Sequence, residues 1–152
     1  YLPDLKYLSP QLSGQWSQAQ DYFQKASLAI AEMFRQTGPP VIDPETGLMK
    51  RGLIVRHLLL PGQTADAKRI LRYLRSTYGT DIYVSILNQY TPMSHLAELS
   101  APEISLLKRP VTEAEYARVI SFAEQIGIEQ GYIQEEGTAL ESFIPEFDGK
   151  GL

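Results

Sequence analysis

The sequence contains no cysteine and only two histidines among its 152 residues. The absence of cysteine excludes disulfide bonds, thiol catalysis, and any zinc or iron–sulfur site that thiolates of this chain would ligate. The two histidines, His57 and His95, do not form an HExxH motif. We therefore expect no metal site built from this chain's own side chains.

The sequence also lacks a strong excess of one charge, a long apolar run and a phosphate-binding loop. Its net charge is −4 with acids and bases interspersed, which argues against a nucleic-acid partner. No apolar run approaches the roughly 20 residues of a membrane span, and the N-terminus has no signal-peptide layout. We therefore expect no membrane association and a cytoplasmic location. Neither GxGxxG nor GxxxxGK[ST] occurs.

The length and composition predict one folded unit. A chain of 152 residues, 43% hydrophobic and 21% charged, can bury one core, so we predict a single domain over residues 1–152. The chain begins "YLPDLKYL", a strand-like pattern without an initiator methionine. We therefore expect a fragment of a longer protein.

Strand and helix patterns alternate along the chain. Apolar runs predict strands at residues 1–8, 52–60 and 81–90, and a weaker one at 128–134. Helical periodicity predicts helices at 17–36, 64–78 and 112–125, with capping boxes Ser17–Gln20 and Thr112–Glu115 and with Thr64 as a cap. Loops are predicted at 9–16 and 91–111, the second long enough to be a lid, and a hairpin or short excursion at 41–49. The alternation predicts an α/β fold of parallel β/α units, either half of a barrel or a small open sheet.

Polar side chains interrupt the three main strands towards their carboxyl ends. They are Asp4 and Lys6 in the first strand, Arg56 in the second, and Asn88 and Tyr90 in the third. Residues two apart share one face of a strand, so Asp4 lies with Lys6, and Asn88 with Tyr90. The carboxyl ends of parallel strands are where α/β proteins bind ligands. Arginine and lysine suit a carboxylate or phosphate there, and aspartate an ammonium, a ribose or a cation.

A structural role is an equally good interpretation of each charged pair taken alone. Asp4–Lys6 or Asp4–Arg56 can be an ion pair between neighbouring strands. An unpaired buried arginine is costly, so we predict that Arg56 pairs with Asp4 or lies in solvent. His57 points to the opposite face, where we expect a satisfied partner beneath a helix rather than a catalytic base. The apolar "SFIPEF" stretch, residues 142–147, is expected to anchor the tail or to cover the open side of a partial barrel.

Several longer segments resemble one protein family. They are "YLPDLKYLS", "RGLIVRHLLLPG", "YVSILNQYTP" and "GYIQEEG…ESFIPEFDGKG", in this order and spacing. Together they resemble pyruvate formate-lyase activating enzyme and, more closely, the related radical S-adenosylmethionine proteins. The resemblance extends over essentially the whole chain.

The resemblance implies a fold and a chemistry. The family has a partial (β/α)6 TIM-like barrel, of which this chain would be the C-terminal half. The family's N-terminal half carries a CxxxCxxC loop for a four-iron four-sulfur cluster, which reductively cleaves S-adenosylmethionine to a 5′-deoxyadenosyl radical. That radical removes a hydrogen atom from a substrate, which in activating enzymes is a glycine of a partner enzyme. Without cysteine, this chain would be inactive alone.

The resemblance also implies binding residues. Asp4 and Lys6 match a "DLK" strand that approaches the methionyl and ribose groups of S-adenosylmethionine and a nearby cation. Arg56 matches an arginine that faces the same ligand, and Asn88 to Tyr90 match the strand end near the ribose and adenine. Activating enzymes have a histidine near the position of Tyr90, so the chain departs from them there.

Two further functional hypotheses remain open. The first is a small α/β binding domain that holds an anionic metabolite without catalysis. The second is an interaction domain that docks through an open sheet edge, which a half-barrel would expose to self-association. Expected partners are therefore a glycyl radical enzyme or another protein substrate, or a second copy of the chain.

Overall fold

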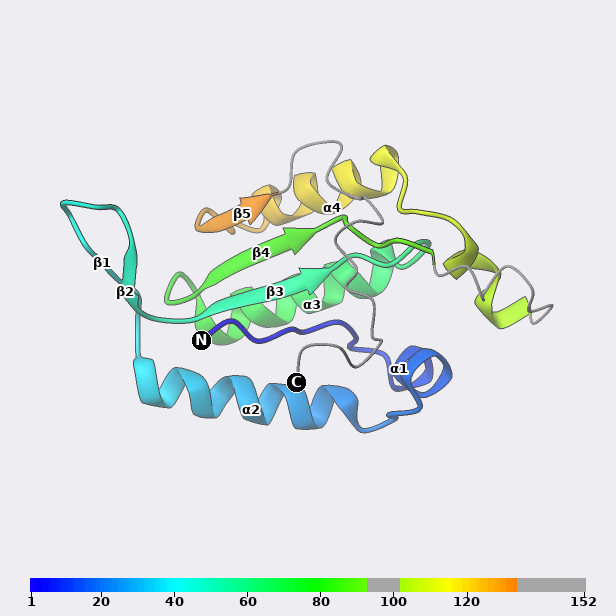
Figure 1. Ribbon diagram of the computed structural model, residues 1–152, viewed down its shortest axis with the longest axis horizontal. Coiled ribbons are helices and arrows are strands. Elements are labelled where there is room, and N and C mark those ends of the chain that lie inside the picture. The colour runs from blue at the N-terminus through cyan, green and yellow to red at the C-terminus, as the bar shows by residue number, and fades with distance from the viewer. Residues whose placement is uncertain (93–101, 134–152) are drawn as a thin grey trace, which may run out of the picture.

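The computed structural model describes residues 1–92 and 102–133, which form a mixed α/β fold (Figure 1). Its helices are α1 (Pro10–Ser17), α2 (Tyr22–Thr37), α3 (Thr64–Tyr78) and α4 (Glu113–Gln125), with a 3₁₀ helix, η2 (Pro102–Lys108). Its strands are β1 (Val41–Ile42), β2 (Met49–Arg51), β3 (Ile54–Leu58), β4 (Tyr83–Leu87) and β5 (Gly131–Ile133). The α/β class predicted from the sequence is confirmed.

The main sheet is parallel and follows the order of the chain. Strands β3, β4 and β5 are neighbours in that order, with Arg56 opposite Ser85 and Ser85 opposite Tyr132. The N-terminal segment, residues 1–8, runs along the other side of β3. There the Arg56 amide donates to the Pro3 carbonyl at 2.9 Å, and the Leu5 amide donates to the Arg56 carbonyl at 2.8 Å. The N-terminal segment, β3, β4 and β5 thus lie side by side in chain order.

The prediction of a regular strand at residues 1–8 is only partly right. The structure has an isolated parallel bridge between Asp4 and Arg56 in place of a strand. Backbone bonds to β3 involve Tyr1, Pro3 and Leu5, and Pro3 has no N–H to contribute. The pairing is therefore too sparse for a continuous ladder.

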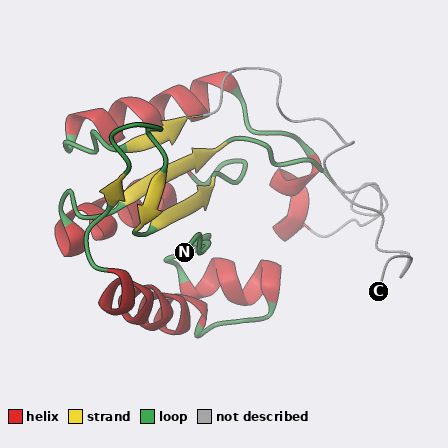
Figure 2. Ribbon diagram, turned by 60° about the vertical axis from the view of Figure 1, so that its left-hand side comes forward, coloured by secondary structure: helices red, strands yellow, loops and turns green. Residues whose placement is uncertain are grey.

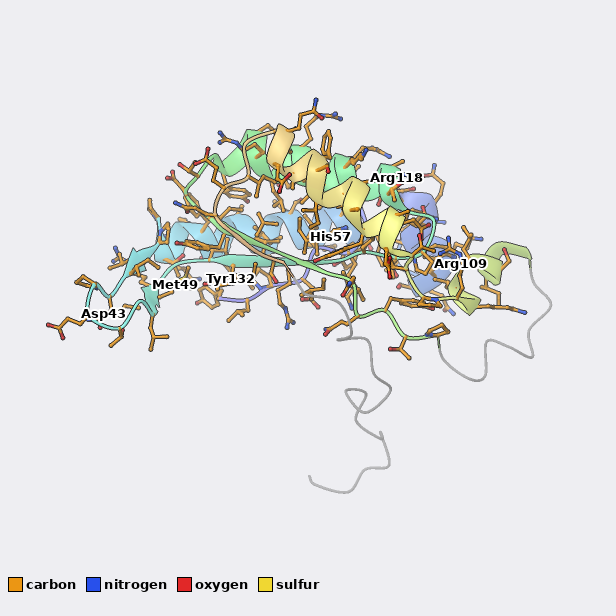
Figure 3. The ribbon with its side chains drawn as sticks, turned by 90° about the horizontal axis from the view of Figure 1, so that it is seen from above. Asp43, Met49, His57, Arg109, Arg118 and Tyr132 are labelled. Carbon is orange, nitrogen blue, oxygen red and sulfur yellow. The ribbon has the colours of Figure 1, made fainter. Side chains whose placement is uncertain are left out.

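Helices α2, α3 and α4 pack on one face of the sheet, where the core lies (Figure 3). Alternate strand residues point towards these helices, as a parallel sheet covered on that side requires. The fully buried core residues include Leu5, Leu53 and Val55 from the sheet side and Ile30, Ile70, Leu71, Leu74 and Val119 from the helices. Among the described residues, no helix covers the opposite face, where Ile54, Arg56 and Leu58 are partly exposed (Figure 3). We call this the helix-free face.

Residues 10–16 belong to helix α1 and Ser9 is its N-cap, so the predicted loop there is wrong. Pro10 occupies the first helical position, where its missing N–H is not needed, and the Ser9 hydroxyl accepts from the Leu12 amide at 3.3 Å. The predicted Ser17–Gln20 capping box is also wrong, because Ser17 ends α1. Gln18, with a φ of 53°, turns the chain, and α2 then begins at Tyr22.

For the other elements, the structure agrees more closely with the predictions from the sequence. Helices α3 and α4 end at Tyr78 and Gln125 as predicted, and Thr112 and Glu115 form the predicted capping box. Gln63 rather than Thr64 is the N-cap of α3. Strands β1 and β2 form the hairpin alternative for residues 41–49 (Figure 2), and β3 and β4 are shorter than predicted. Residues 102–108 of the predicted lid form η2. Residues 93–101 of the predicted lid and the "SFIPEF" anchor lie outside the described residues.

Candidate functional site

A row of side chains with polar groups crosses the helix-free face at one level of the sheet. Asp4 forms a bridge with Arg56, Arg56 lies opposite Ser85, and Ser85 lies opposite Tyr132. Neighbours in register on a parallel sheet project from the same face, so the four side chains form one line across four chain segments. We call these four residues the polar row. It includes two of the residues predicted from the sequence, Asp4 and Arg56.

The charged end of the polar row is an ion-pair cluster. The Arg56 Nε donates to the Asp4 Oδ1 at 2.7 Å, and the Lys6 Nζ lies 3.9 Å from the Asp4 Oδ2. This confirms the prediction that Arg56 pairs with Asp4 or lies in solvent. The three side chains are 43%, 37% and 41% exposed for Arg56, Asp4 and Lys6. A pair this exposed contributes at most about 1 kcal/mol to stability, so stability alone is a weak reason for placing three charges here.

The cluster is suited to an anion because it carries two cations and one carboxylate. The hydrogen bond from Arg56 to Asp4 uses Nε, and within residues 1–92 and 102–133 no partner of the Nη groups is found. Those groups can therefore donate to a carboxylate or phosphate in a two-point contact. Asp4 keeps a carboxylate beside them for an ammonium or hydroxyl group.

The other end of the polar row is aromatic. The rings of Tyr83 and Tyr132 stack with centroids 5.9 Å apart, and Tyr132 is 53% exposed on the helix-free face (Figure 3). An exposed aromatic surface can accept the flat face of a heterocycle. Sequence reasoning missed both Ser85 and Tyr132. The signal for Ser85 was present, because it alternates with Val84 and Ile86 as Arg56 alternates with Val55 and His57.

The two remaining predicted residues lie beyond the sheet. Asn88 follows β4 directly and is half-buried. The Tyr90 hydroxyl donates to the Leu107 carbonyl of η2 at 2.8 Å, and burial raises the pKa of that hydroxyl. The structure therefore brings Asp4, Lys6 and Arg56 together, whereas Tyr90 holds the chain after β4 against η2.

His57 anchors the segment that carries Asp4 and Lys6. Its Nδ1 lies 2.8 Å from the Leu5 carbonyl, which can only accept, so Nδ1 carries the proton. The ring is 2% exposed on the helix side of the sheet, as expected for a structural residue beneath a helix (Figure 3). The expectation that the ring is satisfied holds only for Nδ1, because the buried Nε2 has no hydrogen-bond partner among the described residues. Asp66 of α3 holds the next part of the segment, because its Oδ2 accepts from the Leu8 amide at 2.8 Å.

The burial of His57 makes stability depend on pH. Burial lowers the pKa of His57 from its ordinary value of 6.5, although its hydrogen bond to Leu5 and the nearby Asp66 act in the opposite direction. The unfolded chain then binds a proton that the folded chain does not, so stability is lost as the pH falls below about 6.5. We expect the free energy of unfolding to fall by up to about 1.4 kcal/mol per pH unit there. Urea denaturation at pH 7.0, 6.0 and 5.0 measures this slope.

A variant isolates the contribution of His57. His57→Gln should reduce the slope between pH 7 and pH 5, and the difference in slope from the wild type is the contribution of the buried ring. An unchanged slope in His57→Gln would show that the buried ring does not titrate in this way.

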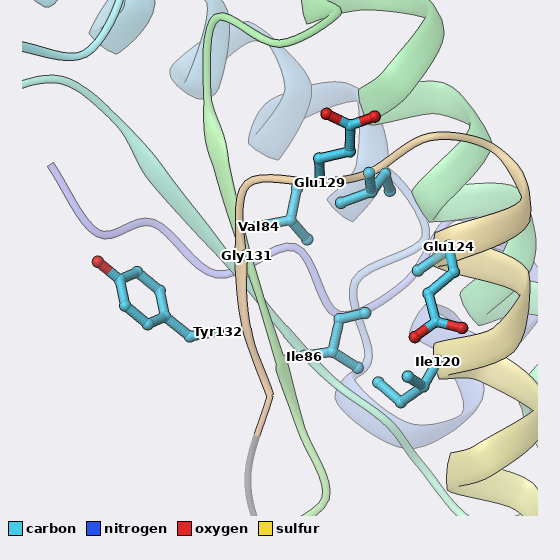
Figure 4. A pocket seen from close by; sticks show the side chains of 9 residues that line it. Val84, Ile86, Ile120, Glu124, Glu129, Gly131 and Tyr132 are labelled. Carbon is cyan, nitrogen blue, oxygen red and sulfur yellow. The ribbon is translucent and has the colours of Figure 1, made fainter.

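A cavity of about 420 Å³ lies between α4 and strands β4 and β5, and Tyr132 of the polar row is one of its lining residues (Figure 4). Its lining is mainly apolar, with Ile86 and Ile120 facing one another and with Glu124 and Glu129 at its rim. None of the five predicted site residues lines it. It offers no cation for a carboxylate or phosphate, so the polar row remains the better candidate site.

Within the described residues, no group of three or more histidine, aspartate or glutamate side chains is placed to hold a metal ion. Nor does any helix of that part combine the length and apolar character of a membrane span. Comparison with protein-family models, with curated proteins and with solved structures found no match.

Proposed function

We propose that this chain is the C-terminal half of a partial (β/α)6 barrel of a radical S-adenosylmethionine protein of the activating-enzyme type. In this proposal its helix-free face is the inner wall of the barrel and contributes to binding S-adenosylmethionine. Support comes from the segments that resemble that family and from the architecture. Parallel strands in chain order with helices on one face are the arrangement of barrel units.

The observation that carries the proposal is the polar row. Arg56 and Lys6 present positive charge on a face that the described helices leave uncovered, beside the carboxylate of Asp4. S-adenosylmethionine has a carboxylate, an ammonium group, ribose hydroxyls and an adenine ring. Arg56 and Lys6 suit its carboxylate, Asp4 its ammonium or ribose, and Tyr132 an aromatic ring. The residues present therefore fit this ligand.

The iron–sulfur cluster does not fit this chain, which has no cysteine. The cluster would supply the electron that cleaves S-adenosylmethionine, and its ligands would have to come from a sequence outside these residues. We therefore propose that this chain alone binds the ligand and is catalytically inactive. The hydrogen donor of the intact protein would be a glycyl radical enzyme or another protein substrate.

One alternative function has support from the same cluster. Two cations around one carboxylate, all half-exposed, would also hold a phosphate or a small dicarboxylate. In that case the chain is a binding domain for an anionic metabolite, and no adenosyl group is recognised.

Isothermal titration of the 152-residue chain tests the proposal. S-adenosylmethionine should bind more tightly than inorganic phosphate, because phosphate engages only the cations. Arg56→Gln should weaken binding of S-adenosylmethionine about tenfold to a hundredfold, the usual cost of losing hydrogen bonds to a charged group.

The matched control is Arg35→Gln, which breaks the exposed Arg35–Glu32 pair on α2 and should leave the affinity unchanged. Preference for phosphate over S-adenosylmethionine would favour the metabolite-binding alternative. Equal losses of affinity for S-adenosylmethionine in Arg56→Gln and Arg35→Gln would show that the polar row does not bind this ligand.

A further inference from the structure

The N-terminal segment has an outer edge that faces away from β3. Pro3 and Leu5 direct their backbone groups towards β3, where they bond to Arg56. Because backbone groups alternate in direction along an extended chain, those of Asp4 and Lys6 face outwards. Such an unpaired edge is a ready site for pairing with another strand.

The hydroxyl of Tyr22 occupies this edge. It accepts from the Lys6 amide at 3.0 Å and donates to the Asp4 carbonyl at 3.1 Å. A neighbouring strand at this position would bond to the same two backbone groups, the amide of Lys6 and the carbonyl of Asp4. The hydroxyl of a side chain therefore takes the place of a strand backbone.

The position of Tyr22 is fixed by its neighbours. Tyr22 is the first residue of α2, and its ring packs edge-on against Tyr7 with centroids 5.3 Å apart. The Tyr7 hydroxyl is in turn hydrogen-bonded to the Ser17 hydroxyl at 2.9 Å. Burial raises the pKa of Tyr22, so its hydroxyl keeps the proton that it donates to Asp4. Among the described residues, no other group bonds to the Lys6 amide or the Asp4 carbonyl.

We propose that Tyr22 is an edge-blocking residue that prevents a second copy of this chain from pairing with the segment around Leu5. The sequence of the segment is complementary to itself in an antiparallel pairing centred on Leu5. Asp4 of each copy would then lie opposite Lys6 of the other, with backbone groups of both residues facing the partner. Opposite charges in directly opposed positions stabilise a strand pair. This inference concerns the 152-residue chain alone and does not depend on any ligand. In the intact barrel of the proposed function, the preceding strand would take the place of Tyr22 at this edge.

Tyr22→Phe tests the proposal because it keeps the ring against Tyr7 and removes only the hydroxyl. Sedimentation velocity over a concentration series should show dimerisation about tenfold tighter than in the wild type. Amide hydrogen exchange at low concentration should show a faster Lys6 amide. Tyr7→Phe is the matched control: it removes a hydroxyl from the same aromatic pair without touching the edge, and it should remain as monomeric as the wild type.

A second variant tests the edge itself. Lys6→Pro removes the outward-facing donor, a change that edge strands tolerate, so Tyr22→Phe/Lys6→Pro should return to the monomeric state of the wild type. A Tyr22→Phe variant that exposes the Lys6 amide yet stays monomeric would overturn the proposal. If that variant does not fold, amide hydrogen exchange in the wild type tests the proposal instead. A wild-type Lys6 amide that exchanges as fast as an unprotected amide would also overturn the proposal.

Discussion

Replacing Leu5 by alanine is expected to lower the free energy of unfolding by about 2–5 kcal/mol. Leu5 is 0% exposed and packs in the core beneath the helices, so the truncation leaves a cavity. Leu5 also holds the segment that positions Asp4 and Lys6, because its amide and carbonyl bond to Arg56 and His57. Urea denaturation followed by circular dichroism measures the loss.

Leu2→Ala is the matched control for this prediction. Leu2 lies on the same segment but is 62% exposed, so the same truncation there should change stability by less than about 0.5 kcal/mol. Similar losses for the two variants would show that the segment does not pack with alternate residues against the helices.

Replacing Glu115 by glutamine is expected to lower the free energy of unfolding by about 2–4 kcal/mol. The Glu115 carboxylate accepts two hydrogen bonds from Arg109, both at 2.7 Å, and one from the Gly62 amide at 2.8 Å. It also accepts from the amide and hydroxyl of Thr112, at 2.9 and 3.0 Å. Glutamine would turn one of these acceptors into a donor that faces other donors. The contact between the start of α4 and the turn before α3 would then be lost.

The same carboxylate makes stability depend on acid pH. The Arg109 guanidinium holds the pKa of Glu115 well below its usual range. Burial opposes it with the second-largest effect, and the amides of Thr112 and Gly62 lower the pKa further. A depressed folded pKa means that the stabilisation is complete above about pH 5 and is lost as the pH falls through about 4 and below. Chemical denaturation at pH 7 and pH 3 should show this loss in the wild type and a smaller one in Glu115→Gln. Glu113→Gln, on the exposed side of the same turn, should behave as the wild type does.

The sequence predicted best the elements whose signals are local. Helix α4 has a capping box, and α3 has a regular apolar stripe and a glycine at its end, so both are found where expected. Helix α1 was missed because Pro10 and Gly14 within eight residues are typical of a loop, whereas Pro10 in fact occupies the one helical position that suits it. The start of α2 was misplaced because Gln18 adopts a left-handed conformation that turns the chain, and nothing in the local sequence indicates that conformation.

The candidate site was predictable only where alternation along each strand and the cost of an unpaired charge were enough. The Asp4–Arg56 pair follows from strand alternation and from the cost of an unpaired arginine. Tyr132 and Tyr22 were missed for a different reason: their positions depend on the register of β5 and on where α2 begins, which are set by tertiary packing. Tyr90 was placed in a strand that ends three residues earlier, because Leu87 is the last residue that pairs.

Backbone amide chemical shifts recorded during a titration with S-adenosylmethionine test the central claim most directly. We predict that the largest shifts map to the helix-free face, at Asp4, Lys6, Arg56 and Ser85, and that they disappear in Arg56→Gln but persist in Arg35→Gln. Shifts confined to the apolar cavity near Ile120, or no saturable shifts at all, would contradict it.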